Sequence, residues 1–197
     1  MNEKTWWYLS RRSEIVALVL MVLSIVWGVL LSTRVLKPYD RPAWLLDLHR
    51  WLGGTALVMT GLHLLGLMLD GYINFGFAEI LIPGASSYRP LAVAIGVVSF
   101  YVLIAIQVTS YFRKRISKRL WYGVHVLSYG LVWSAALHAG LAGTDVNNRA
   151  YQVLASVLTV GAIVATIVRI VSRRRPSPVA VGELRVDASK PSADVLA

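Results

Sequence analysis

Four histidines are the residues of this sequence best suited to chemistry, and they form two pairs. His49 and His63 are fourteen residues apart, and His125 and His138 are thirteen residues apart. A neutral imidazole can ligate a transition metal, exchange a proton near neutral pH or hydrogen-bond between helices. Which of these chemistries applies depends on the elements that carry the two pairs.

Both pairs lie in segments that are apolar enough to cross a membrane. Hydrophobic residues make up 56% of the 197 residues and charged residues only 15%, well below the share of about 25% in soluble domains. A helix spans the hydrocarbon core with ~20 apolar residues. Five segments have this character, at about 14–32, 43–69, 90–112, 119–141 and 150–172. We therefore predict an all-α, polytopic membrane protein with a bundle of five transmembrane helices.

The two ends of the chain have different compositions. Residues 1–172 are expected to form the membrane domain, and residues 173–197 are rich in Pro, Ser and charge. Such composition is typical of segments that bury too little apolar surface to fold. We predict that these last residues form a disordered cytoplasmic tail.

Basic residues predict the orientation. With five crossings, one side receives only Lys4, Arg11, Arg12, Arg89 and Arg149, and the other side receives all remaining Lys and Arg, including the run "RKRISKR". The positive-inside rule then places the N-terminus outside the cell membrane and the C-terminus in the cytoplasm. This asymmetry accounts for the net charge of +10, so we expect contacts with membrane lipid and no nucleic-acid partner.

The predicted topology brings the histidines to two levels. The second and fourth spans run in the same direction, so His49 and His125 lie near the cytoplasmic end, and His63 and His138 near the outer end. The levels are ~20 Å apart at 1.5 Å rise per residue. Fourteen residues return to within ~40° of one helix face, whereas thirteen miss it by ~140°. The fourth span must therefore be distorted near Gly130, or the two sites must be offset sideways.

Two imidazoles per level suit the iron of a b-type haem. Ionisable groups inside a membrane usually mark function, and neutral imidazole is a common axial ligand of haem iron. We predict two haems b, ligated by the four histidines. Arg50 and Arg119 near the inner level are candidate partners of the propionates, and the outer candidates are Arg11, Arg12 and Arg89. Clearance for the porphyrins is expected at Gly53, Gly54, Gly61, Gly123 and Gly130.

Other sites remain open at this point. Zinc would need three or four ligands at one level, and Asp47 and Asp70 do not cluster with two histidines. The absence of cysteine excludes thiolate sites and covalent c-type haem attachment. The histidines can also act as interhelical hydrogen bonders, with the glycines as packing positions. A transporter or channel that uses histidines for protons or metal is a further alternative, with Gln107 and Arg169 as additional polar groups.

Two stretches resemble a known superfamily. "HRWLGGTALVMTGLH" and "RKRISKRLWYGVHVLSYGLVWSAALH" resemble the ferric-reductase-like transmembrane domain superfamily, which includes NADPH oxidases, ferric reductases and the haem-binding subunit of bacterial methionine-sulfoxide reductase systems. "DGYINFGFAEILIPGASSYRP" and "HAGLAGTD" are similar to small bacterial stand-alone members. The resemblance covers about residues 43–145. It implies that His49 and His125 hold the inner haem, and His63 and His138 the outer one.

The resemblance also implies electron transfer across the membrane. Members of the superfamily often have six helices where we count five, and many carry a cytoplasmic flavin and nicotinamide domain. Only about 25 residues follow the last span here, too few for such a domain. We therefore expect a separate electron donor, either a flavoprotein reductase or membrane quinol, and an acceptor or partner protein on the outer face. Whether the chain is itself an enzyme is left open, and the alternative is a haem-bearing membrane anchor of a larger oxidoreductase complex.

The apolar loop at 70–89 belongs to the outer level. It contains "INFGFAEILIP" and a predicted turn at Pro83–Gly84. Two functions are open for it, a lid or docking surface for the acceptor, or a shield that keeps water from the outer site.

Overall fold

The computed structural model describes residues 4–33, 41–71, 75–145 and 147–173, and the regular structure within these ranges is α-helical. The elements are α1 (Lys4–Thr33), α2 (Pro42–Leu69), the short α3 (Phe77–Leu81), α4 (Pro90–Tyr111), α5 (Lys118–Ala142) and α6 (Arg149–Arg173). All except α3 are long and apolar enough to cross a membrane. The chain is thus a multi-pass membrane protein, and the predicted all-α fold with five spans is confirmed. The predicted tail began at residue 173, but Arg173 belongs to α6, and the rest of the predicted tail lies outside the described residues.

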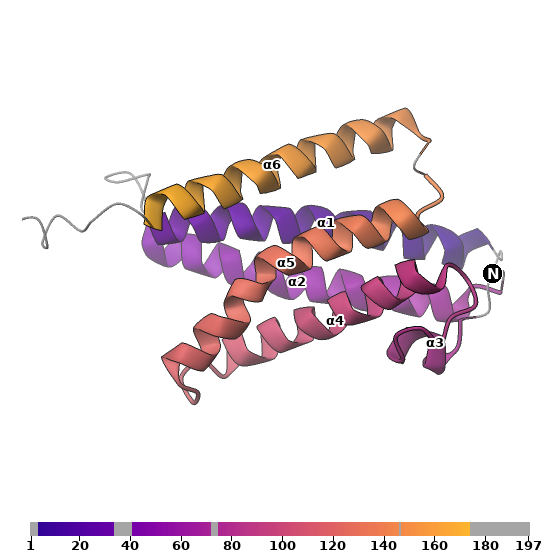
Figure 1. The fold of residues 1–197 in the computed structure, drawn as a ribbon, viewed down its shortest axis with the longest axis horizontal. Coiled ribbons are helices and arrows are strands. Elements are labelled where there is room, and N and C mark those ends of the chain that lie inside the picture. Colours follow the sequence, from indigo (N-terminus) through magenta and orange to yellow (C-terminus); the bar gives the residue numbers. More distant parts are fainter. Residues whose placement is uncertain (1–3, 34–40, 72–74, 146, 174–197) are drawn as a thin grey trace, which may run out of the picture.

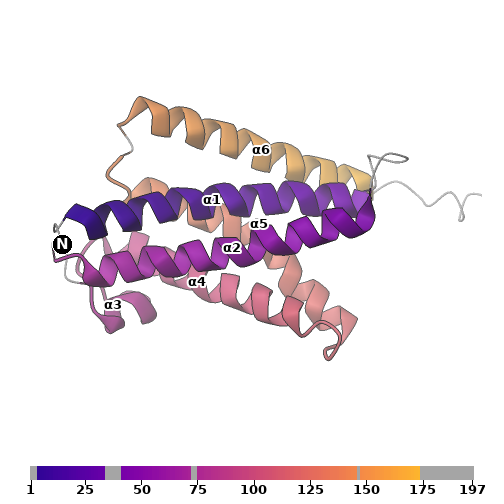
Figure 2. The same ribbon diagram turned by 180° about the vertical axis from the view of Figure 1, so that it is seen from behind.

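Two antiparallel helix pairs make up the body of the fold. α1 lies along α2, and α4 is joined to α5 by a short connection (Figures 1 and 2). α6 packs on the outside of α1, so it flanks the body (Figures 1 and 2). α5 crosses the long axis obliquely (Figure 1). As a result, α5 contacts both α4 and α1.

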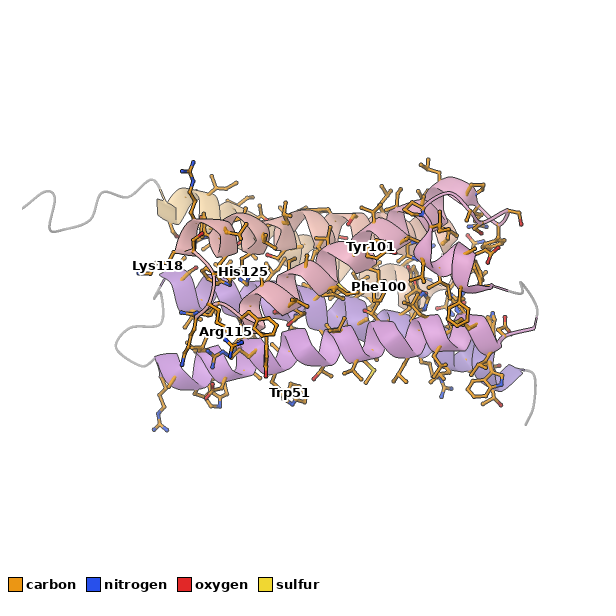
Figure 3. The ribbon with its side chains drawn as sticks, turned by 90° about the horizontal axis from the view of Figure 1, so that it is seen from below. Trp51, Phe100, Tyr101, Arg115, Lys118 and His125 are labelled. Carbon is orange, nitrogen blue, oxygen red and sulfur yellow. The ribbon has the colours of Figure 1, made fainter. Side chains whose placement is uncertain are left out.

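The two ends of the bundle differ in charge. One end carries the exposed basic residues of the α4–α5 connection and of the adjoining start of α5, namely Arg113, Lys114, Arg115, Lys118 and Arg119. We call it the basic end; Figure 3 shows Arg115 and Lys118 there, with His125 further along the bundle. α2 also begins at this end, and α6 finishes there (Figure 1). The opposite end carries α3 and the α5–α6 connection, and we call it the α3 end.

α1 begins ten residues before the apolar run from which it was predicted. Its first turns contain Arg11, which forms an ion pair with Asp145 and a hydrogen bond to Thr144 in the α5–α6 connection. Ser13 donates its hydroxyl to the Leu9 carbonyl at 2.6 Å. Because these polar groups are satisfied, the helix continues through them, and hydropathy alone marks its start too late.

α1 and α2 are in close contact at Gly66. A Cβ atom at Gly66 would lie 2.8 Å from the backbone nitrogen of Ser10 and 2.9 Å from its Cα. Backbone atoms cannot give way as a flexible side chain can, so Gly66→Ala must separate the two helices. We expect a loss of about 1–3 kcal/mol of stability, seen as a lower midpoint of thermal unfolding in detergent.

Gly61→Ala is the matched control for this change. Gly61 lies on the same helix, and a Cβ there would meet nothing within 4 Å. The Gly61→Ala variant should therefore have the same midpoint of thermal unfolding as the unmodified protein. Equal midpoints for the Gly61 and Gly66 variants would contradict the predicted close approach.

An apolar cluster occupies the middle of the bundle. Leu103 and Ile106 of α4 and Leu131 of α5 are buried, and Met21 and Leu57 pack against them. Leu57 lies between His49 and His63 along α2, and Leu131 between His125 and His138 along α5. The cluster therefore separates the two histidine levels with hydrocarbon. Such side chains leave no polar partner for water.

The segment around α3 packs against α4. Phe75 and Ile80 are buried with Val93 and Val97 of α4, and the Tyr101 hydroxyl donates to the Leu81 carbonyl at 2.7 Å. The predicted turn is present, with Gly84 at φ 88°, where a residue without Cβ is favoured.

Candidate functional site

The four histidines meet in two pairs between α2 and α5. The ring centres of His49 and His125 are 5.9 Å apart, with their planes at 71°. Those of His63 and His138 are 6.4 Å apart, with their planes at 80°. The structure therefore brings together one histidine of each helix at each level.

These separations suit an ion held between two imidazoles. A histidine nitrogen lies about 2 Å from its metal, so two rings on opposite sides of one ion have centres about 6 Å apart. Within the part of the chain that the structure describes, no group of three or more His, Asp or Glu side chains is placed to hold a metal. Each level thus offers two protein ligands.

α1 holds the two histidines of α2 through its backbone. The Nδ1 atom of His49 donates to the Ser24 carbonyl at 2.9 Å, and that of His63 to the Ser10 carbonyl at 3.0 Å. The hydroxyls of both serines lie close to the same nitrogens, at 3.2 and 3.0 Å. A nitrogen that donates to a carbonyl carries the ring proton, so each Nε2 keeps its lone pair. This is how proteins orient metal-ligating histidines.

α4 orients the histidines of α5. The Nδ1 atom of His138 donates to the Ala92 carbonyl at 2.7 Å. The Nδ1 atom of His125 lies 3.4 Å from the Ser110 hydroxyl. The Nδ1 atoms of all four rings therefore contact α1 or α4, which leaves the Nε2 atom of each ring for another partner.

The thirteen-residue spacing is resolved by the path of α5. The helix is continuous from Lys118 to Ala142, across Gly130. Its two histidines point in different directions around the helix axis, yet each reaches a histidine of α2. α5 runs obliquely to the long axis (Figure 1), and this path is compatible with a contact to α2 at both levels.

Two glycines make room for histidine rings. A Cβ at Gly96 would lie 2.6 Å from Cε1 and 2.7 Å from Nδ1 of His138. A Cβ at Gly28 would lie 3.3 Å from Cε1 of His49. Neither glycine was predicted from the sequence, because each lies on a helix without histidine.

The five glycines that were predicted to provide clearance behave differently. A Cβ at Gly53 would meet the Gln107 amide of α4 at 2.6 Å, so Gly53 permits close packing there. A Cβ at any of the other four would meet nothing within 4 Å, and these are Gly54, Gly61, Gly123 and Gly130.

A cavity surrounds the His63–His138 pair. It contains about 1330 Å³ of empty space, part of it open to the exterior, and its walls include Phe100 and Leu131. Glu14 of α1 also lines it, although hydropathy places this residue at the very start of the first span. Because α1 begins earlier than predicted, Glu14 lies inside the helix, four residues after Ser10, and lines the same cavity as His63 and His138. A carboxylate at such depth is costly and usually functional, and this position was missed from the sequence.

The predicted propionate partners at the basic end are exposed. A guanidinium nitrogen of Arg50 lies 3.5 Å from a carboxylate oxygen of Asp47 in an ion pair within α2, and both side chains are largely exposed. Arg119 is exposed in the first turn of α5.

At the α3 end, two of the three candidate arginines bind oxygen atoms of the protein, and the third, Arg12, lies over the Tyr8 ring at 5.5 Å. Arg11 binds Asp145, as described above. Arg89 donates to the Leu141 carbonyl at the end of α5, and Arg12 is exposed. Arg11 and Arg89 therefore tie α1 and the start of α4 to the last turn of α5 and the connection that follows it.

Comparison of the chain with known proteins identifies one family. A family model described as ferric reductase like transmembrane component matches residues 12–136. The match includes His49, His63 and His125 and ends two residues before His138. No curated protein matches the chain, and no solved structure matches it.

Proposed function

The chain belongs to the ferric reductase like transmembrane family, and on that premise we propose that it carries electrons across a membrane through two b-type haems. Membership indicates transmembrane electron transfer in general, in a membrane redox component that works with other proteins. We propose His49 and His125 as the axial ligands of one haem, and His63 and His138 as those of the other.

The observation that carries this proposal is the pairing of the imidazole rings together with the hydrogen bonds of their Nδ1 atoms. Each level presents two rings at the separation of a doubly ligated ion. Three of the four rings donate Nδ1–H to a backbone carbonyl. Hydrogen bonding between helices alone would not require a second histidine ring about 6 Å away at each level. The donor set therefore fits haem iron, whose porphyrin supplies the remaining four nitrogens.

When bound, haem supplies a one-electron iron couple. The protein's own residues would bind each haem, orient the histidine rings and separate the two levels. The serine and alanine carbonyls of α1 and α4 fix the rings, and the apolar cluster around Leu131 places hydrocarbon side chains between the levels. With two histidines available at each level, a bound haem iron would have no open ligand position for a substrate, which favours electron transfer over chemistry at the metal.

We further propose that the basic end faces the cytoplasm of a cell-membrane protein, because it gathers the exposed basic residues of the α4–α5 connection. The donor at that end is a separate flavoprotein reductase or membrane quinol, and the acceptor binds at the α3 end. Arg50 and Arg119 lie at the basic end and are candidates for contact with the propionates there.

A spectrum of the purified protein tests this proposal. The reduced-minus-oxidised difference spectrum should show a low-spin b-type cytochrome. Quantification as the pyridine haemochrome should give about two haems per chain, since two axial ligands are available at each level. A protein that stays colourless after haem is supplied during expression would contradict the proposal.

A further inference from the structure

Two tryptophans near the His49–His125 pair have unsatisfied donors. Among the described residues, the indole N–H groups of Trp27 and Trp121 are buried and have no hydrogen-bond acceptor. An indole nitrogen can only donate, and a buried one usually has a partner. Two such groups near one histidine pair therefore indicate an acceptor outside the part of the chain that the structure describes, and a bound cofactor is one.

Both indoles lie on the basic-end side of the histidine pair. Trp121 is one turn before His125 in α5, and the two rings are stacked, with centres 4.9 Å apart and planes at 23°. Trp27 is three residues beyond Ser24, whose carbonyl holds His49. α5 begins and α1 finishes at the basic end. The two donors thus lie between the histidine pair and that end.

A positive charge lies beside one of the two indoles, that of Trp121. The guanidinium carbon of Arg113, in the α4–α5 connection, lies 5.3 Å from the centre of the Trp121 ring. Donors without acceptors, next to a cation, are suited to an anionic acceptor, because hydrogen bonds to ionised groups are the strong ones.

We propose that Trp27 and Trp121 donate hydrogen bonds to the propionate carboxylates of the haem held by His49 and His125, with Arg113 as the adjacent positive charge. This inference rests on the proposed function and adds to it a carboxylate-binding subsite. The two indole donors are buried, whereas Arg113, Arg50 and Arg119 are exposed. The indoles would fix which edge of the porphyrin faces the basic end.

The test compares haem with haem dimethyl ester, in which both carboxylates are blocked and uncharged. Full-length protein with His63→Ala is freed of haem and titrated with each porphyrin, so that only the His49–His125 site is loaded. Trp27→Phe and Trp121→Phe keep an aromatic ring and remove the N–H group. Each variant should reduce the preference for haem over the ester about tenfold, through weaker binding of haem alone.

Trp51→Phe is the matched control. Trp51 lies two residues after His49 on α2, and its side chain is 63% exposed; Figure 3 shows it towards the same end as His125. Its replacement should leave the preference for haem unchanged. Resonance Raman bands of the propionate bending modes give a second measurement, and they should shift in Trp27→Phe and Trp121→Phe but not in Trp51→Phe.

Two outcomes would overturn the inference alone. Equal weakening of haem and ester binding would assign the tryptophans to packing, and an unchanged preference with unshifted bands would show that their N–H groups do not reach the carboxylates. Failure of the protein with all four histidines to bind either porphyrin would overturn the proposed function, and this inference with it.

Discussion

Protein carrying His63→Ala should contain about one haem per chain, whereas the unmodified protein is expected to contain about two. The two histidine levels are ~20 Å apart along α2, and each has its own set of hydrogen bonds from α1 and α4. Loss of one axial nitrogen therefore empties the His63–His138 site and leaves the other site intact. Pyridine haemochrome quantification measures the change directly.

His49→Ala is the reciprocal variant. It should also retain about one haem, but the remaining signal should have the midpoint potential of the other site, because the surroundings of the two pairs differ. A cavity with Glu14 lies beside His63 and His138, whereas Trp121 stacks on His125. If both variants lost all haem, or if neither lost any, the assignment of two independent sites would be wrong.

Gly96→Ala should also empty the His63–His138 site, although all four histidines remain. The added Cβ would lie between 2.6 and 3.0 Å from three ring atoms of His138. The ring cannot move away freely, because its Nδ1 atom is held by the Ala92 carbonyl at 2.7 Å. The ring must leave its position, and we expect haem content to fall towards one per chain.

Gly140→Ala is the control for this substitution. It adds the same methyl group to a membrane helix, near the end of α5 that follows His138, and a Cβ there would meet nothing within 4 Å. Its haem content should equal that of the unmodified protein. Full haem content in Gly96→Ala would contradict the position of His138 against α4.

Much of the fold follows from the sequence because membrane helices obey simple length and hydropathy rules. Five apolar runs gave the five spans, with starts and ends close to those of α2, α4, α5 and α6. The levels of the histidines follow from topology and the fixed helical rise, so His49 was expected beside His125. The ligation of haem by these residues stays a prediction that the experiments above address.

The partners of the histidines were harder to predict, although one signal was present. Ser10 and Ser24 are fourteen residues apart, as are His49 and His63. In an antiparallel pair of helices, equal spacings place Ser24 beside His49 and Ser10 beside His63, as the hydrogen bonds show. Comparing spacings between adjacent spans would have found this match.

The remaining contacts depend on tertiary packing. The carbonyl of Ala92 and the missing side chain of Gly96 have no chemical signature in the sequence, because any residue has a carbonyl and many membrane glycines serve packing. Glu14 was missed for a different reason. Its depth depends on where α1 begins, and α1 extends through charged residues because Arg11 has partners in the α5–α6 connection.

The hydrocarbon layer formed by Leu103, Ile106 and Leu131 has an electrical consequence. Apolar side chains provide no chain of exchangeable protons. Under the proposed function, we therefore expect an electron that crosses this layer to move without a proton along the same side chains. Such a transfer would be electrogenic and would charge the bilayer as a current charges a capacitor. Moving one elementary charge across the full span involves about 2.3 kcal/mol for every 100 mV of membrane voltage. The voltage of the host membrane would then be part of the driving force and would assist or oppose each transfer according to its sign.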